Sequence, residues 1–403
     1  MPFRESWPVL GGLLFIVGFG AGLPLVAMVG LGTMALGVTS RWWSNHLFDR
    51  LELRRSLAER RVFINEPVEL EVRLVNRKPL PLPWFEWRLG LSEHLRAAGE
   101  RLAASAVPGL HYLVQRGAIG WYAAERWTVT LTAARRGYHQ VGPASIRSSD
   151  ILGAWPARTE DAELDHLVVY PRVYRLPDLG LPAERPFGDA RGGERIFEDP
   201  LRIAGLREYR PGDPLRRIDW KATARAGDLR SRVYEPSATR LLYVLLNIDT
   251  LEHAWEGYLS DELERLVSVA ASVIAWAAGA RYAVGLLANG AYPDADRPIR
   301  LPPSRSRDQL VRLLEALAVV QPLTMGDLAG AIRREMGRIE AGSTLIAVAA
   351  LVPAPLAEAL SRLAAEGHRV HLLATTDRAA RATIPGVTVE RVAADFQPAE
   401  ALA

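Results

Sequence analysis

The chain has 403 residues, of which 49% are hydrophobic and 24% charged, so it is long enough for two or three domains and too apolar to be disordered throughout. Its 49 lysines and arginines nearly balance its 46 aspartates and glutamates, leaving a net charge of +3, smaller than the imbalance typical of bulk nucleic-acid binding. The sequence contains no cysteine, which excludes disulfides, thiolate zinc sites and cysteine nucleophiles.

The N-terminal part, residues 1–50, begins with an uncharged stretch. No charged residue lies between Ser6 and Ser40, about 35 residues, whereas one membrane-spanning helix needs roughly 20. Because Gly20-Ala21-Gly22-Leu23-Pro24 is typical of a turn, we predict a transmembrane helical hairpin with spans at about 7–20 and 23–40. One long span broken at Pro24 and a buried hydrophobic hairpin of a soluble protein are the alternatives. A cleaved signal peptide is disfavoured, because the apolar run exceeds a typical signal core.

Charges beside this stretch predict an orientation. Arg41, Arg50, Arg54 and Arg55 follow the second predicted span closely. By the positive-inside rule this flank lies in the cytoplasm, so we expect an inner-membrane protein with the bulk of its chain in the cytosol. The pair Trp42-Trp43 fits an aromatic anchor at the membrane interface.

Residues 51–170 are predicted to form a β-rich, sandwich-like domain. The segment 68–75 alternates strictly between apolar and polar residues, and 127–132 repeats the pattern, as half-buried strands do. The prolines of 79–83 are typical of a loop between strands. Residues 171–200 are rich in proline, glycine and charge, and we predict an extended linker there.

Residues 201–240 hold a turn and a short predicted helix among many arginines. Pro211-Gly212-Asp213-Pro214 is turn chemistry, because proline pre-sets one dihedral and glycine accepts a positive φ. Asp219 precedes the segment 220–226 and Gly227 follows it, which predicts a two-turn helix with an N-cap and a C-terminal glycine. Trp220 and Ala224 share one face, so we expect Trp220 to pack on a core.

The cations of this region leave two interpretations open. In the first, Arg217 pairs with Asp213 and Asp219 in a network that locks the loop. In the second, Arg216 together with Lys221 and Arg225, which share a helix face at i,i+4, forms a docking surface for an acidic partner, a phosphate or an anionic lipid. A nucleic-acid patch is disfavoured, because the aromatic residues here are few and Trp220 is expected to be buried.

The pattern Tyr-x-Pro-Gly-Asp-x-x-Arg-x-Ile-Asp-Trp-Lys-Ala-x-Ala-Arg at 209–225 closely resembles the signature of the domain of unknown function 58 (DUF 58) family of membrane-anchored bacterial and archaeal proteins. The resemblance also takes in the N-terminal apolar stretch, the β-rich region, Val-Tyr-Pro-Arg at 169–172 and the C-terminal part. It makes the signature residues candidates for binding: Tyr209, Pro211, Gly212, Asp213, Arg216, Arg217, Asp219, Trp220, Lys221 and Arg225.

Residues 241–403 are predicted to form a doubly wound α/β domain. The continuous apolar run 241–248 is typical of a parallel strand buried on both faces. Further strands are predicted at 282–288, 344–350 and 369–374, alternating with helices at 259–279, 306–319, 326–340 and 354–366. The family resemblance implies that this domain is von Willebrand factor A-like.

Such A-like domains often hold Mg²⁺ at the carboxyl ends of strands. Their metal motif begins Asp-x-Ser-x-Ser, but here Leu251 and His253 follow Asp249 in place of the serines. Thr324 is a weak match to the motif's threonine, and the later aspartate is missing. Because Mg²⁺ requires near-octahedral oxygen ligands, we predict no metal and no other cofactor, with Asp249 and Thr324 as weak candidates.

No catalytic motif is recognisable. None of the eight histidines forms His-Glu-x-x-His, and no Gly-x-Ser-x-Gly elbow is present. A P-loop is excluded because the only lysines, Lys78 and Lys221, follow an arginine and a tryptophan rather than glycine. We therefore predict a protein that is not an enzyme.

The resemblance implies a partner, a MoxR-type AAA+ ATPase. We expect a non-enzymatic, membrane-anchored scaffold or adaptor that works with such an ATPase in the assembly or maturation of a complex. A metal-dependent A-domain ligand-binding protein and an accessory factor in cell-envelope or polysaccharide assembly are the alternatives.

Overall fold

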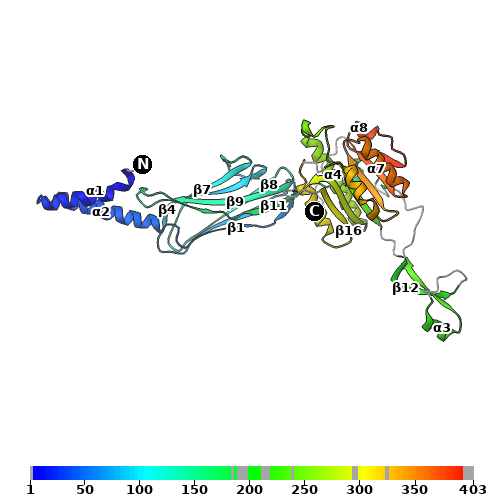
Figure 1. Ribbon diagram of the computed structural model, residues 1–403. Helices are drawn as coiled ribbons and strands as arrows, with labels where there is room; N and C mark the ends of the chain where they lie inside the picture. The colour runs from blue at the N-terminus through cyan, green and yellow to red at the C-terminus, as the bar shows by residue number, and fades with distance from the viewer. Residues whose placement is uncertain are drawn as a thin grey trace. The chain divides into compact units, whose positions relative to one another are not determined.

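The structure is a computed structural model that describes residues 3–182, 186–187, 198–209, 218–236, 240–292, 298–322 and 326–393. The chain divides into two compact units, Met1–Pro171 and Arg172–Ala403 (Figure 1). The first unit contains two helices and a β domain, and the second contains an α/β domain and a smaller segment of two strands and one helix. This mixed α and β content agrees with the predicted fold class.

Two N-terminal helices, α1 (Phe3–Gly20) and α2 (Pro24–Asn45), are joined by a turn at 21–23 and pack along each other. Their close approach depends on glycine. A Cβ at Gly18 of α1 would lie 2.5 Å from the backbone nitrogen of Ala27, and one at Gly30 of α2 would clash with the backbone of Phe15. By length and composition α2 is long and apolar enough to cross a membrane, whereas the apolar stretch of α1, Ser6–Gly20, is shorter.

The β domain consists of two sheets that share one hydrophobic core. In one sheet the strand order is β1-β3-β8-β5, and in the other it is β2-β11-β9-β4-β7-β6 with β10 beside β9. Trp87 is fully buried in the core, 5.5 Å from the ring of Trp127. The strands are β1 (Leu51–Leu57), β2 (Arg61–Phe63), β3 (Val68–Asn76), β4 (Leu82–Ser92), β5 (Leu95–Ala97), β6 (Ala103–Ala104), β7 (Leu110–Ile119), β8 (Ala124–Ala133), β9 (Gly137–Ser148), β10 (Ala157–Asp161) and β11 (Asp165–Tyr170).

The alternation in the sequence predicts the inward face of these strands correctly. On β3, Val68, Leu70, Val72 and Leu74 are buried, and their polar neighbours are more exposed. The predicted strand 127–132 lies within β8, which pairs with β3. Residues 51–170 therefore hold the strands β1 to β11 in two sheets.

A buried lysine joins the end of α2 to the β domain. Leu47, two residues beyond α2, is fully buried in the core. The Lys78 ammonium donates to the carbonyl oxygens of Leu47 and Asp49. Burial lowers the pKa of Lys78 to about 8, and the nearby Asp49 carboxylate opposes this shift. The contacts hold the chain where the helix becomes a strand.

Part of the predicted linker 171–200 is folded onto the second unit. Tyr174, Leu176 and Leu179 are buried, and the Tyr174 amide donates to Ser272 Oγ at 2.9 Å. The segment includes a short 3-10 helix, η1 (Leu176–Leu179). Phe187 is also buried, with its ring edge-on to Trp276 at 5.3 Å. The described residues 172–182 and 186–187 are therefore not an extended linker, because apolar side chains between the prolines anchor them.

The α/β domain contains a six-stranded sheet with the order β16-β15-β14-β17-β18-β19. All neighbours are parallel except β16, which is antiparallel to β15. The strands are β14 (Leu241–Leu246), β15 (Ala283–Ala291), β16 (Pro298–Ser304), β17 (Thr344–Ala349), β18 (Arg369–Ala374) and β19 (Val387–Arg391). The order reverses between β14 and β17, the kind of place where open α/β sheets bind ligands.

Helices cover both faces of this sheet (Figure 1). The helices α4 and α5 contact each other and one face, and α6 and α7 contact the other, where their apolar residues form a core with Leu345 and Leu372. The helices are α4 (Ser260–Gly279), α5 (Gln309–Val319), α6 (Leu328–Glu335), α7 (Ala354–Ala365) and α8 (Asp377–Ala380), with 3-10 turns η3 (Ala254–Glu256) and η4 (Met336–Arg338).

The sequence patterns missed two edge strands and lengthened one helix. Pro298, Pro302 and Pro303 disguise β16, because prolines are tolerated only where backbone amides need no sheet partner. The strand β19 is short and half-exposed. The helix expected at 326–340 begins at Leu328 and ends at Glu335, where η4 follows.

Candidate functional site

The described part of the signature region is a small two-stranded module. The strands β12 (Glu198–Glu208) and β13 (Arg230–Pro236) are antiparallel, and α3 (Trp220–Ala226) lies between them in the sequence. Ile218, just before α3, is buried and bridges to Ser231 of β13. We call β12, α3 and β13 the signature module.

Asp219 holds α3 in place. Its Oδ1 accepts from the amide of Ala222 at 3.0 Å, and its Oδ2 accepts from Nε of Arg232 at 3.0 Å. The amide hydrogen bond, followed by the bond from Arg232, lowers the pKa of Asp219. At the other end Gly227 adopts φ +80° and its amide donates to Thr223, as a C-cap does. The predicted cap, helix and terminal glycine are all present.

Trp220 does not pack on a core, contrary to the prediction. Its side chain is 67% exposed, and Ala224 on the same helix face is exposed too. The reason is that other residues make the contacts with β13. Ile218, just before α3, is buried, and the Thr223 Oγ1 on α3 accepts from the amide of Arg230. A two-turn helix held by these contacts leaves its Trp220 face to solvent.

Lys221 and Arg225 are exposed on α3 beside Trp220. We define these three residues as the α3 surface. Tyr209 is half-buried, and its amide donates to the carbonyl of Leu229 at 2.9 Å, so its backbone belongs to the module's ladder. The remaining signature residues lie outside the described residues, namely Pro211, Gly212, Asp213, Arg216 and Arg217. The expected pairing of Arg217 with Asp213 and Asp219 falls there as well.

A second polar group lies at the carboxyl end of β14, where the strand order reverses. The Asp249 carboxylate accepts from Nδ2 of Asn289 at 3.1 Å, and Asn289 Oδ1 accepts from the amide of Ile248 at 2.8 Å. Asn247 is buried, and its Nδ2 donates to the carbonyl of Leu351 at 3.1 Å. Its Oδ1 is buried and has no hydrogen-bond partner in the part of the chain that the structure describes.

The electrostatics of Asp249 are the opposite of those of Asp219. Burial raises the pKa of Asp249, the nearby Asp327 raises it further, and the bond from Asn289 opposes both effects. Removal from water thus disfavours the ionised carboxylate in spite of its amide partner.

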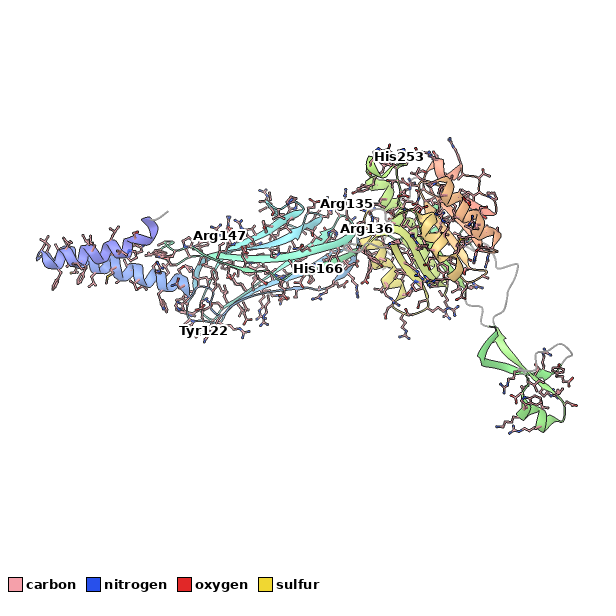
Figure 2. The ribbon with its side chains drawn as sticks, in the orientation of Figure 1. Tyr122, Arg135, Arg136, Arg147, His166 and His253 are labelled. Atoms are coloured by element: carbon pink, nitrogen blue, oxygen red, sulfur yellow. The ribbon has the colours of Figure 1, made fainter. Side chains whose placement is uncertain are left out.

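These residues do not fit a magnesium site. Leu251 and His253 offer no hydroxyl, and Thr324 lies outside the described residues. Within the described ranges, no three Asp, Glu, His or Cys side chains gather as metal ligands. The His253 ring, labelled in Figure 2, instead stacks on Trp255 at 4.0 Å. The side-chain partner shown for Asp249 is the Nδ2 donor of Asn289, which cannot ligate Mg²⁺.

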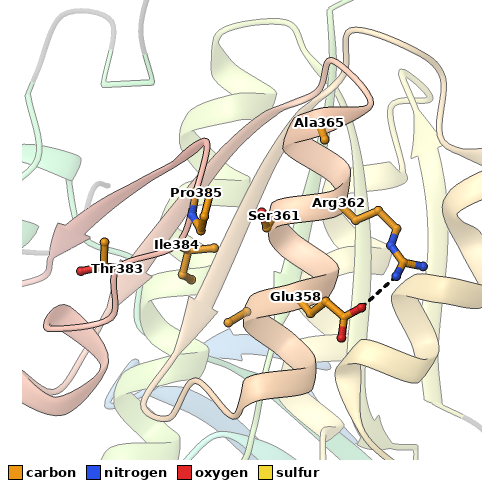
Figure 3. Close-up of a pocket in the computed structure, with 8 residues that line it drawn as sticks. Glu358, Ser361, Arg362, Ala365, Thr383, Ile384 and Pro385 are labelled. Atoms are coloured by element: carbon orange, nitrogen blue, oxygen red, sulfur yellow. Dashed lines mark hydrogen bonds and ion pairs between the residues drawn. The ribbon is translucent and has the colours of Figure 1, made fainter.

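Elsewhere in the α/β domain, His371 and the residues of a surface groove make ordinary structural contacts. His371 lies 3.2 Å from Glu390 of the neighbouring strand β19, a carboxylate that sequence proximity does not reveal. A shallow groove between α7 and the residues before β19 is lined by Ser361, Ile384 and Pro385, and Glu358 pairs with Arg362 along its rim at 2.8 Å (Figure 3). The groove's walls are largely apolar, and its charged residues Glu358 and Arg362 pair with each other.

The family comparison places this geometry in context. Residues 205–393 match the family described as "Protein of unknown function DUF58". This DUF58 region begins in β12 and ends just after β19, so it holds both the α3 surface and Asp249. The matched region does not include the N-terminal helices or the β domain.

A relative matches a larger share of the chain than the family does. The chain is 26% identical over 268 residues to the Uncharacterized protein YeaD of Bacillus subtilis, a match that covers 66% of this chain. The chain spans 59% of the length of that relative.

Similar solved structures cover 30% of this chain, but their TM-scores are too low to bear on fold or function. The CARDB domain of the PF1109 protein from Pyrococcus furiosus is 13% identical, with 86% of its chain covered and a TM-score of 0.20. The non-cellulosomal cohesin from Archaeoglobus fulgidus is 9% identical, with 91% of its chain covered and a TM-score of 0.20.

Within the DUF58 region, sequence reasoning found Asp219 and Asp249 but missed their partners. Arg232 lies 13 residues from Asp219, and Asn289 lies 40 residues from Asp249. Strand pairing brings each partner into contact with its aspartate. The spacing of these residues in the sequence does not predict either contact. For Arg232, the single available clue is its place in a strand that follows the helix.

Proposed function

We propose that this protein is a non-enzymatic, membrane-anchored scaffold that docks a partner protein through the α3 surface. The observation that carries the proposal is the 67% exposure of Trp220 on a helix whose position is locked by Asp219. Exposing a tryptophan is unfavourable in water, and tryptophan and arginine are the residues that most often dominate binding energy at protein interfaces. A fixed helix presents them with little entropy left to lose on binding.

The charge of the α3 surface favours an acidic partner. Lys221 and Arg225 flank Trp220, and both are exposed. Cations at the rim of an interface speed association with a surface of opposite charge and select against basic partners. The family resemblance implies a MoxR-type AAA+ ATPase as that partner. The absence of a P-loop in this chain fits a division of labour in which the partner hydrolyses ATP.

Membrane attachment through α1 and α2 is the second part of the proposal. The length and apolarity of α2 and the glycine contacts between the two helices support a transmembrane pair. Arg41, Arg50 and Arg54 follow the apolar stretch and favour the inner membrane, with the rest of the chain in the cytosol.

The von Willebrand factor A-like assignment of the α/β domain also belongs to the proposal. Its strand order, with the antiparallel edge strand β16 and the reversal between β14 and β17, supports the assignment. In this picture the A-like domain acts as a binding module without a metal.

Co-purification of the full chain from native membranes tests the docking function. We expect the unmodified protein to retain a MoxR-type ATPase, and we expect both Trp220→Ala and the double variant Lys221→Glu/Arg225→Glu to lose it. Trp255→Ala is the matched control, since Trp255 is an 80% exposed tryptophan outside the signature module. Retention of the ATPase by both α3 variants would place docking elsewhere, and its absence from the unmodified protein would refute this partner.

A metal-dependent ligand-binding function is the second candidate. The observation in its favour is the unpartnered Oδ1 of Asn247 close in sequence to Asp249, at the reversal of the strand order. The poor match to magnesium ligands makes this the weaker candidate. Metal titration, described in the Discussion, distinguishes the two.

A further inference from the structure

The loop between β9 and β10, residues 149–156, is fastened to the last turns of α2. Asp150 is buried at its base, and its carboxylate accepts from the hydroxyl of Ser40 on α2. The same carboxylate accepts from the amide of Leu152 at 3.0 Å and from that of Trp155 at 2.7 Å. One side chain therefore shapes the loop and ties it to the helix.

Two further contacts fix the other side of the loop. The hydroxyl of Ser44 donates to the carbonyl of Trp155 at 2.9 Å. The guanidinium of Arg41 lies over the Trp155 ring, 5.2 Å from its centroid. The loop thus follows α2 back from its end at Asn45 to Ser40, which at 1.5 Å per residue is about 7–8 Å along the helix.

The tip of this fastened loop is apolar and exposed. Ile151 is 65% exposed and Leu152 is 58% exposed, although Asp150 directly before them is buried and Ala154 and Trp155 after them are half-buried. Trp42 on α2 is exposed near the same level. Arg41 on α2 adds positive charge at this end of the β domain. Arg147, labelled in Figure 2, adds another and lies three residues before Asp150.

This combination is typical of a protein surface at a lipid headgroup layer. Ser40 ends the uncharged stretch of the sequence and Arg41 follows it, so the loop tip lies level with the change from apolar to charged residues on α2. Tryptophan and arginine side chains are enriched at that depth of a bilayer. Apolar loop residues that are not buried in the protein core are stabilised when they enter the boundary between lipid headgroups and acyl chains.

We infer that Ile151 and Leu152 insert into the interfacial layer of the bilayer beside α2, with anionic headgroups near Arg41 and Arg147. This inference rests on the proposed membrane anchoring. The loop gives the β domain a second membrane contact, and Asp150 is the positioning residue that holds it at the correct depth.

Single-cysteine labelling tests the insertion cleanly, because the chain has no cysteine of its own. The variants are Leu152→Cys, Val29→Cys on the exposed face of α2, and Val107→Cys as the water-exposed control. Val107 lies near Leu110, which pairs with Ser92, whereas Ser148 at the base of the loop pairs with Phe85. Positions 107 and 152 thus lie at opposite ends of the β domain.

Each variant of the full chain is labelled with an environment-sensitive nitrobenzoxadiazole dye and reconstituted into phosphatidylcholine–phosphatidylglycerol vesicles that carry shallow or deep nitroxide lipids. We expect strong quenching at 29 by deep nitroxides, quenching at 152 by shallow nitroxides, and none at 107. If position 152 behaves like 107 while 29 is quenched, the loop does not insert, although anchoring stands. If 29 is not quenched, the anchoring itself fails.

A positioning variant and a second readout complete the test. Asp150→Ala in the Leu152→Cys background should reduce the shallow quenching at 152 and leave the quenching at 29 in its own background unchanged. Quenching at 152 that survives this change would contradict the role of Asp150. A dye at 152 that is shielded from water but not quenched by any nitroxide lipid would show that protein, rather than lipid, covers the loop, and would overturn the inference.

Discussion

The signature module and the carboxyl edge of the α/β sheet each contain an aspartate that accepts a hydrogen bond from a distant side chain. The pKa values of the two aspartates nevertheless shift in opposite directions. Asp219 accepts from the Ala222 amide and from Arg232, and these donors lower its pKa. Asp249 is removed from water near Asp327, and burial raises its pKa. The first carboxylate is stabilised as an anion, and the second is destabilised as one.

The difference shows that the two carboxylates make different structural contacts. In the signature module the ionised Asp219 holds a small helix so that Trp220 faces outward. At the carboxyl edge, Asn247 and Asn289 bind strand ends to each other, and the polar groups face inward. The outward surface is the one proposed to dock a partner, whereas the inward amide network joins strand ends of the sheet.

The largest expected effect separates the two regions by stability. Leu246 is fully buried on the central strand β14, and Leu246→Ala should destabilise the α/β domain by about 2–5 kcal/mol because it leaves a cavity. Trp220→Ala should leave that domain's stability unchanged. Hydrogen-exchange mass spectrometry of the β14 and β17 peptides measures both variants. A comparable loss of protection in Trp220→Ala would contradict the outward assignment of this tryptophan.

Removing the cap should act on α3 alone. Asp219→Ala deletes the acceptor of the Ala222 amide and the partner of Arg232, so the α3 amides should exchange on the order of three- to tenfold faster, as is typical for a lost cap. Asp228→Ala is the control, since Asp228 is an exposed aspartate just beyond the helix. Unchanged exchange in Asp219→Ala would mean that β13 holds α3 without the cap.

The pH dependence of Asp249 should be of opposite sign to that of Asp219. A folded-state pKa above the ordinary 3.8 means that the folded protein binds its proton more tightly, so stability falls as pH rises from about 3.8 through the raised pKa. Asp249→Asn removes this loss and keeps an acceptor for Asn289. Chemical denaturation of the two proteins between pH 4 and 7 should therefore show a growing advantage of the variant.

Two comparisons test whether the pH dependence comes from Asp249. Asp327→Asn removes a charge that raises the pKa of Asp249, so it should narrow the pH range over which stability falls. For Asp219 we expect the reverse behaviour, because its folded-state pKa is lowered. The ionised carboxylate therefore stabilises the fold above pH 3.8, and this stabilisation is lost as the pH falls through the folded-state pKa. An advantage of Asp249→Asn that did not change with pH would refute the burial of an ionisable Asp249.

The two lysines show a similar contrast, because Lys78 is buried and Lys221 is exposed. We expect a smaller effect for this pair, seen in the titration of the buried ammonium. Carbon-13 labelling of lysine should give two sets of NMR signals, from Lys78 and Lys221. The Lys78 signal should titrate near pH 8, because burial lowers its pKa to about 8. Lys78→Arg should remove this signal and leave that of Lys221. A Lys78 signal that titrates at the ordinary value of 10.5 would show that its site is open to water.

The smallest expected effect is that of added metal. Isothermal titration of the full chain in detergent with Mg²⁺ or Mn²⁺ should release no binding heat, and Asp249→Ala should not alter the result, because no three Asp, Glu, His or Cys side chains gather as ligands among the described residues. A saturable heat that Asp249→Ala abolishes would instead support the metal-dependent function.

Much of the fold was predictable from local patterns, but the role of Trp220 was not. The continuous apolar run of β14 and the alternation of β3 report burial directly, because side chains on a strand have a period of two. For α3 the same kind of reasoning failed. A helix of two turns has too few positions for its apolar face to be identified, and Ile218 outside the helix fills the buried position instead.

The sequence by itself determined the apolar N-terminal helix, strands with a clear apolar pattern such as β3 and β14, and the cap and terminal glycine of α3, since each depends on residues only a few positions apart. Only the tertiary structure decided which partners the functional candidates have. Arg232 reaches Asp219 across 13 residues, Asn289 reaches Asp249 across 40, and Asn247 reaches Leu351 across 104. Strand pairing and register set these distances, so the electrostatics of each aspartate emerge only when the chain is folded.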